Sequence, residues 1–389
     1  MTTHNYAHFS VEGLLQMARD ATGLSDFGPD SFRPGLEHLV AAINELPLTE
    51  MGLIRTRNSV LGVLIGRLGV WHHRQTHPEV AAEEIKQPLF VIGLPRTGTT
   101  LLIGLLGQDP DNRVPLMWEV SIPYPPPEAA TYETDPRIAR VTAGLAAVDG
   151  LNPEVMAMHP VGAQLPQECI GFIAQECLSY IFYATLPIKG YNDWVDAQDQ
   201  TAAYRWHKIF LQHLQSRHRR QRWALKSPAH MNFMADLFRA YPDAIILNTH
   251  RDPVDAVTSH CSLHWKFWQQ AMGSCDKQMA GEQITEMIDN WLRRYLDWRD
   301  ANPQMDSQIH DIDYSELVAD PIATVKRIYR RIGLEVSPTF ERGMQQFLAD
   351  NRQDKFGRHR YTPREFGLTK AQLASRYRRY RERFCVAKP

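Results

Sequence analysis

The chain has 389 residues, of which 43% are hydrophobic and 22% charged, an ordinary globular balance that excludes global disorder. Its 43 lysines and arginines against 44 acidic residues leave a net charge of −1, which argues against a protein held to nucleic acid or to a membrane surface by bulk charge. No apolar run reaches the roughly 18 residues of a membrane span, the N-terminus lacks a signal-peptide pattern, and the cysteines are too few and scattered for a disulfide framework. We therefore expect a cytoplasmic protein without a membrane span.

Residues 1–88 are predicted to be a helical region that packs on the rest of the protein. Val11, Leu14, Leu15 and Ala18 recur at intervals of three and four residues, the spacing of one apolar face of a helix. Prolines separate the successive helical segments of this region.

From Leu89 onward, short apolar runs alternate with helical patterns. The runs that we predict to be buried strands are residues 89–94, 222–226, 244–250 and 308–314. This alternation predicts an α/β domain over 89–389, with a parallel sheet covered by helices on both faces. We expect a mostly helical insertion at about 130–217 over the sheet, and a basic closing helix with a solvated face at 369–384.

The most informative segment is Gly93–Thr100, which reads G-L-P-R-T-G-T-T between the first predicted strand and the start of a helix. A glycine-bearing turn at that place brings backbone N–H groups and a helix N-terminus together, which makes an anion site. The segment also carries a guanidinium, three hydroxyls and a glycine that lets a ligand come close, on Arg96, Thr97, Thr99, Thr100 and Gly98.

This loop makes the predicted sheet P-loop-like, but it differs from the nucleoside-triphosphatase pattern G-x-x-x-x-G-K-[ST]. Thr99 stands where that pattern has its lysine, and the cation of the loop is Arg96. The missing lysine argues against a small-molecule kinase. We keep the kinase as an alternative, together with a non-catalytic nucleotide-binding protein.

The stretch P-R-T-G-T-T from Pro95 resembles the phosphosulfate loop of the sulfotransferases that use 3′-phosphoadenosine 5′-phosphosulfate (PAPS). The chain is similar to the bacterial branch of that family, with an added helical N-terminal region. The resemblance also assigns the 3′-phosphate to Arg251, after the third predicted strand, and to Ser259, eight residues later. Because Ser259 follows Arg251 by about two helical turns, both side chains can reach one phosphate. PAPS is therefore the expected co-substrate.

Two further segments match the family more loosely. In DIDYSELVADP, Tyr314 corresponds to a tyrosine that lies near the adenine. In the basic loop GRHRYTPREFG, the resemblance implies that Arg358, His359 and Arg360 close over the 3′-phosphate.

Four residues are candidates for the chemistry. Arg96 and Lys226 are the cations, and Lys226 ends a predicted strand at the carboxyl edge of the sheet, where ligands of α/β proteins bind. A histidine can accept a proton at pH 7 without large pKa tuning, so we predict that His230, close to Lys226, is the general base. Its rival is Glu168, at the start of an apolar helical segment.

We expect no metal and a metal-independent reaction. His73 and His77, like His260 and His264, have i,i+4 spacing, but neither pair has an obvious third ligand. The expected acceptor is a hydroxyl of a hydrophobic small molecule or lipid, because methionine, tryptophan and phenylalanine are frequent in the helical segments. No nucleic-acid partner is expected, and a homo-oligomer is compatible with the sequence.

Overall fold

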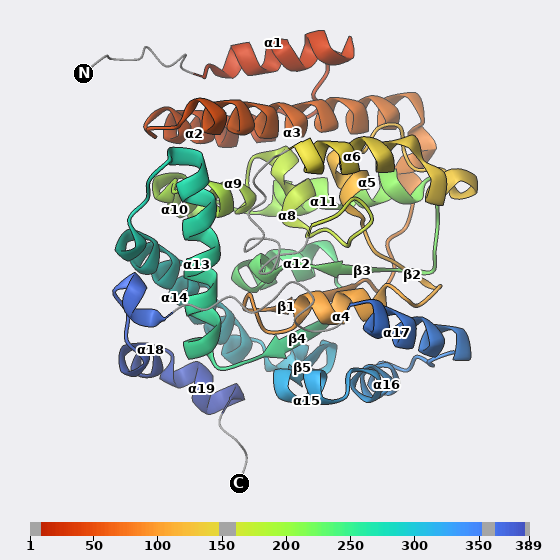
Figure 1. The fold of residues 1–389 in the computed structure, drawn as a ribbon. Helices are drawn as coiled ribbons and strands as arrows, with labels where there is room; N and C mark the ends of the chain where they lie inside the picture. Colours follow the sequence, from red (N-terminus) through yellow and green to blue (C-terminus); the bar gives the residue numbers. More distant parts are fainter. Residues whose placement is uncertain (1–8, 148–160, 352–361, 386–389) are drawn as a thin grey trace.

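A five-stranded parallel sheet lies at the centre of the computed structural model, which describes residues 9–147, 161–351 and 362–385. The strands are β1 (Leu89–Gly93), β2 (Asn112–Arg113), β3 (Arg222–Lys226), β4 (Ile245–His250) and β5 (Ile309–Asp313). They stand in the order β2-β3-β1-β4-β5 (Figure 1). In this register Val91 of β1 lies between Lys226 of β3 and Leu247 of β4, so these three strands end at a common edge.

The predicted strands are confirmed, with some ends moved by one residue. Residues 89–94 end as a strand at Gly93, whose φ of 132° turns the chain away from the sheet. Tyr314 belongs to α15 (Tyr314–Ala319) and not to the strand, because the Asp313 carboxylate accepts hydrogen bonds from the N–H groups of Ser315 (2.7 Å) and Glu316 (3.2 Å). The sequence did not predict β2, since two residues are too short for any periodicity.

Helices cover both faces of the sheet, as predicted (Figure 1). Phe90 and Ile92 point into one core, and Leu89 and Val91 point into the other. The first core contains residues of α8 (Ile170–Ile173), α9 (Ile181–Thr185), α10 (Lys189–Ala197), α11 (Thr201–Gln215), α12 (Met234–Ala240), α13 (Pro253–Met272) and α14 (Lys277–Ala301). The second contains residues of α4 (Thr99–Leu106), α15, α16 (Pro321–Arg331) and α17 (Pro338–Asp350). A smaller cluster joins α5 (Met117–Ser121) and α6 (Pro136–Ala147).

The predicted helical N-terminal region is present and shares the first core. It consists of α1 (Val11–Thr22), α2 (Arg33–Asn44) and α3 (Glu50–Thr76). Arg67 of α3 is fully buried, and its guanidinium lies 2.8 Å from the carboxylate of Glu176. The same guanidinium donates to the carbonyl oxygens of Phe27, Pro29 and Gln175, so it joins the first helices to the segment that follows α8.

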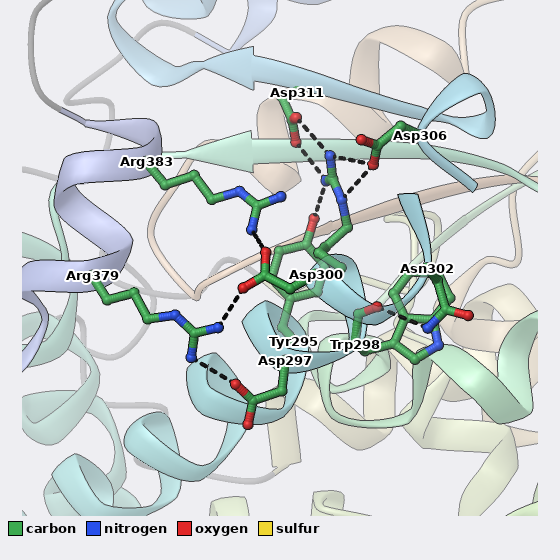
Figure 2. Close-up of polar contacts among 10 residues, drawn as sticks. Tyr295, Asp297, Trp298, Asp300, Asn302, Asp306, Asp311, Arg379 and Arg383 are labelled. Atoms are coloured by element: carbon green, nitrogen blue, oxygen red, sulfur yellow. Dashed lines mark hydrogen bonds and ion pairs between the residues drawn. The ribbon is translucent and has the colours of Figure 1, made fainter. Parts of the chain in front are cut away.

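The C-terminal segment forms two short helices, α18 (Lys370–Arg376) and α19 (Arg378–Phe384), in place of the predicted single helix. Tyr377 follows α18, which packs on α13, and the buried Tyr377 and Tyr380 belong to the first core. Arg379 pairs with Asp297 and Asp300 of α14, each at 2.6 Å, and Arg383 pairs with Asp300 (Figure 2). Arg379 and Arg383 are therefore paired with acidic residues of α14 and are not only exposed to solvent, as the sequence had predicted for this helix.

Candidate active site

The loop after β1 brings the N-terminus of α4 to the carboxyl edge of the sheet. Arg96 and Gly98 both have positive φ angles, 72° and 92°. The backbone angle of Gly98 favours glycine, and a Cβ atom there would lie 3.0 Å from Leu317 and 3.1 Å from Tyr314, so these side chains would have to shift to admit it. An anion at this edge would meet the unpaired N–H groups of the first turn of α4.

The three threonines of the loop have different surroundings. Thr97 is buried, and its hydroxyl donates to the carbonyl oxygen of Leu94 (2.6 Å) and lies 2.7 Å from Oγ1 of Thr249 on β4. It therefore anchors the loop to β4. Thr99 is buried in the first turn of α4, whereas Thr100 is exposed.

Arg251 lies beside this loop, directly after β4. Its Nη1 atom donates to the backbone carbonyl oxygen of Arg96 at 3.1 Å. Its guanidinium carbon lies 4.6 Å from the centre of the Tyr314 ring. The structure thus brings together three residues that the sequence placed in separate segments, Arg96, Arg251 and Tyr314.

Ser259 offers a buried hydroxyl on the helix that follows Arg251. This helix, α13, has the predicted N-terminus, with Asp252 accepting from the N–H of Val254 at 3.0 Å and Pro253 in the first turn. Ser259 is 2% exposed, and its Oγ atom has no hydrogen-bond partner within the part of the chain that the structure describes. Because an unsatisfied buried hydroxyl is unfavourable, a hydrogen bond to a ligand would stabilise this group, although a ligand reaches it only after a local rearrangement of the side chains that cover it.

Lys226 and Glu168 form a pair at the same sheet edge. Lys226, the last residue of β3, is buried, and its Nζ atom donates to Oε1 of Glu168. The N–H of Cys169 donates to the carbonyl oxygen of Lys226 at 2.9 Å, which fixes the backbone next to Glu168. The Glu168 side chain retains 15% of its exposure. The pair therefore places the buried ammonium group of Lys226 beside the carboxylate of Glu168, which is accessible to solvent.

His230 lies deeper, in the short helix Pro228–Phe233 that follows β3. It is 1% exposed, its Nδ1 atom lies 2.7 Å from the hydroxyl of Tyr204, and its ring meets the edge of Phe90. Burial lowers the pKa of His230 to about 3. It is therefore a neutral core imidazole in this structure, and it also lines a small cavity with Tyr204 and Ile173.

The profile of the sulfotransferase family matches residues 88–338, which include the loop, Lys226, Arg251 and Tyr314. The chain belongs to the sulfotransferase family. Among solved structures, it is similar to the sulfotransferase STF1 of Mycobacterium tuberculosis H37Rv, with 31% identity, a TM-score of 0.84, and coverage of 95% of this chain and 98% of that one. It is also similar to STF9 of Mycobacterium avium, with 29% identity, a TM-score of 0.88, and coverage of 99% of both chains.

Curated relatives of this sulfotransferase include omega-hydroxy-beta-dihydromenaquinone-9 sulfotransferase Stf3 of Mycobacterium bovis and of Mycobacterium tuberculosis. Each is 24% identical over 302 residues, which cover 76% of this chain and 75% of the relative. In the described part of the sulfotransferase, no helix combines the length and the apolar character needed to cross a membrane.

One group of side chains in the sulfotransferase resembles a metal site. The ligand atoms of Cys169, His207 and His230, all buried, lie within 4.8 Å of one another. A structural zinc ion takes four ligands, and among the described residues only these three come together. We assign no metal to this group, and the metal-independent reaction stays a prediction.

Three of the expected contact residues belong to a segment that the structure does not describe. Arg358, His359 and Arg360 fall outside the described residues, so their contact with a 3′-phosphate stays a prediction.

The sequence did not predict a role for Thr249, which anchors the loop through Thr97. The polar ending N-T-H of an otherwise apolar strand was the available signal, since polar residues at the carboxyl end of a parallel strand lie where ligands bind.

Proposed function

We propose that this sulfotransferase moves a sulfuryl group from PAPS to a hydroxyl of a hydrophobic small molecule or lipid. One observation carries the proposal: the loop at the N-terminus of α4 lies against Arg251, and the helix that follows Arg251 carries the buried hydroxyl of Ser259, which has no partner among the described residues. A nucleotide with phosphate groups at both its 5′ and 3′ ends needs two such anion sites.

The 5′-phosphosulfate would bind the loop, through backbone N–H groups at the start of α4 and through Arg96 and Thr100. Arg251 and Ser259, which we call the 3′-phosphate clamp, would bind the 3′-phosphate. Tyr314 lies against both Gly98 and Arg251, which supports a place for the adenosine beside these residues. Thr97 and Thr99 would act mainly by shaping the loop, because their side chains are buried.

We further propose Glu168, in preference to His230, as the base. In the transfer, the bond from sulfur to the donor's phosphate oxygen breaks, a bond forms from sulfur to the acceptor oxygen, and the acceptor's proton passes to Glu168. Lys226 holds that carboxylate and is the second cation, after Arg96, for the negative charge on the leaving phosphate. The burial of His230, its hydrogen bond to Tyr204 and its low pKa argue against a role in taking this proton.

A lipid-like acceptor is supported by the relatives of this chain. The name of the Stf3 relatives describes a hydroxylated menaquinone derivative as their acceptor. The small cavity beside His230 adds no support, because polar and apolar side chains line it together and neither Glu168 nor Lys226 is among them. The relatives favour a lipid-like alcohol over a sugar or a peptide.

The proposed donor is tested by measuring Kd for 3′,5′-diphosphoadenosine, adenosine 5′-phosphosulfate and ATP on the full chain. We expect 3′,5′-diphosphoadenosine to bind at least about tenfold more tightly than ATP. Arg251→Ala should weaken its binding by about 1.5–3 kcal/mol, the range for charged hydrogen bonds, and should change adenosine 5′-phosphosulfate binding far less.

Tighter binding of ATP than of 3′,5′-diphosphoadenosine would favour the kinase alternative. Tight binding of 3′,5′-diphosphoadenosine without any sulfated product from a set of lipid alcohols would favour a non-catalytic nucleotide-binding protein.

A further inference from the structure

The residues on both sides of Arg251 are held by the last helix of the described chain. His250 comes directly before Arg251 and is 3% exposed. Its Nδ1 atom lies 2.7 Å from the hydroxyl of Tyr380 on α19, and its ring stacks on Phe384 with centroids 4.0 Å apart. Burial lowers the pKa of His250. The neutral ring can then donate from Nε2 to Asp311 (2.8 Å) and accept the Tyr380 proton at Nδ1.

Asp252 comes directly after Arg251 and has two partners. Its carboxylate caps α13 by accepting from the N–H of Val254 at 3.0 Å. The same carboxylate accepts from Nε of Arg381, which lies 3.1 and 3.0 Å from its two oxygens. Since α13 carries Ser259, Arg381 holds the cap of the helix that bears half of the 3′-phosphate clamp.

Helix α19 is itself fixed at other points. Figure 2 shows Arg379 and Arg383 reaching Asp297 and Asp300 of α14. The Asp311 carboxylate that accepts from His250 is also held by Arg299, at 3.2 and 3.3 Å. The contacts to His250 and Asp252 therefore come from a helix with its own attachment to the core.

We propose that α19 positions the 3′-phosphate clamp, with Tyr380 and Arg381 as positioning residues. We assign them no contact with the nucleotide or the reacting atoms; through His250 and Asp252 they would fix the backbone on each side of Arg251 and the direction of α13. The inference rests on the proposed function, because it assigns the 3′-phosphate to this clamp. It predicts a selective effect on ligands that carry this phosphate.

The test compares Arg381→Gln with Arg383→Gln in the full chain. Both variants remove one positive charge from α19 and one ion pair, but Arg381 pairs with Asp252, which caps α13, whereas Arg383 pairs with Asp300 of α14. We expect Arg381→Gln to weaken 3′,5′-diphosphoadenosine binding about three- to fivefold, the upper part of the range for a partly exposed ion pair. The Kd for adenosine 5′-phosphosulfate, and both Kd values in Arg383→Gln, should change by less than about twofold.

A second variant tests the other side of Arg251 in the same way. Tyr380→Phe keeps the ring and removes the hydroxyl that pairs with His250, so it should show the same selective loss. It also replaces Arg381→Gln as the decisive variant if that protein does not fold. Arg381→Lys, which keeps a cation near Asp252, should recover part of the affinity.

Equal losses for the two nucleotides, or equal losses in Arg381→Gln and Arg383→Gln, would overturn the inference and make α19 a general stabilising helix. A wild-type protein that binds 3′,5′-diphosphoadenosine no more tightly than adenosine 5′-monophosphate would instead overturn the proposed donor. The two failures are therefore distinguishable.

Discussion

At the scale of single residues, access to solvent separates the two candidate bases. Glu168 keeps 15% of its side-chain exposure beside Lys226, whereas His230 is 1% exposed among aromatic rings. A base must reach the acceptor hydroxyl within hydrogen-bond distance, and a group in the core cannot do so without a local rearrangement. The residue type favoured His230, but the position favours Glu168.

The assignment predicts different kinetics for matched amide variants. Glu168→Gln should lower kcat by roughly 10²–10⁴ with little change in 3′,5′-diphosphoadenosine affinity, because it removes a group used in the transition state. His230→Asn, which replaces the ring with a smaller polar group, should lower thermal stability but keep kcat within about tenfold of the wild-type value. Steady-state kinetics with a labelled donor measures both. A dead His230→Asn that retains its fold, together with an active Glu168→Gln, would restore His230 as the base.

At the scale of elements, the phosphate loop depends on backbone conformation as much as on side chains. Gly98 combines a φ of 92° with close neighbours, Leu317 and Tyr314, which would have to shift to admit a Cβ atom. We expect Gly98→Ala to destabilise the fold by about 1–2 kcal/mol and to weaken 3′,5′-diphosphoadenosine binding. Gly62→Ala is the control, because a Cβ at this helical position meets nothing within 4 Å.

The control should be neutral or stabilising by about 0.5–1 kcal/mol, with unchanged nucleotide affinity. Urea unfolding and calorimetric titration provide both quantities. If Gly98→Ala binds the nucleotide as tightly as Gly62→Ala, the loop does not need glycine for its ligand.

Elements with strong local signals could be predicted from sequence, and those set by tertiary contacts could not. The apolar run at β1 and the Asp252–Pro253 helix start depend on neighbouring residues, so both were found. β2 exists only because Asn112 and Arg113 pair with β3, a contact between distant segments. The same limit applies to the site: loop residues were recognised by motif, but the burial of His230 depends on α11 and β1.

At the scale of the whole molecule, the protein interior encloses a group of titratable imidazoles. The buried histidines with clearly lowered pKa include His73, His207, His213, His218 and His230. Burial is the main cause for each, and it lowers the pKa to about 4 for His73 and His218 and to about 3 for His213 and His230. The folded protein therefore keeps these rings neutral where the unfolded chain would protonate them.

This difference fixes the sign of the pH dependence. Below the ordinary histidine pKa of about 6.5, the unfolded state binds more protons, so stability is complete above that pH and falls as the pH drops toward about 4. Each such histidine contributes up to about 1.4 kcal/mol per pH unit. Burial raises the pKa of Glu176 and Asp196, which acts in the opposite direction and offsets part of the loss. We expect a clearly lower free energy of unfolding at about pH 5.5 than at about pH 7.5.

His218→Asn gives the matched test of this explanation. Neither ring nitrogen of His218 has a hydrogen-bond partner within the described residues, so the variant removes a titrating group with no hydrogen bond to break there. It does lose a ring that stacks on Tyr132, with centroids 4.1 Å apart, and that loss should be similar at both pH values. The variant should therefore be less stable at neutral pH, yet lose less stability than the wild type on acidification, by up to about 1.4 kcal/mol per pH unit. Urea unfolding of both proteins at the two pH values measures the four free energies. Parallel losses in the two proteins would mean that groups other than this histidine control the acid sensitivity.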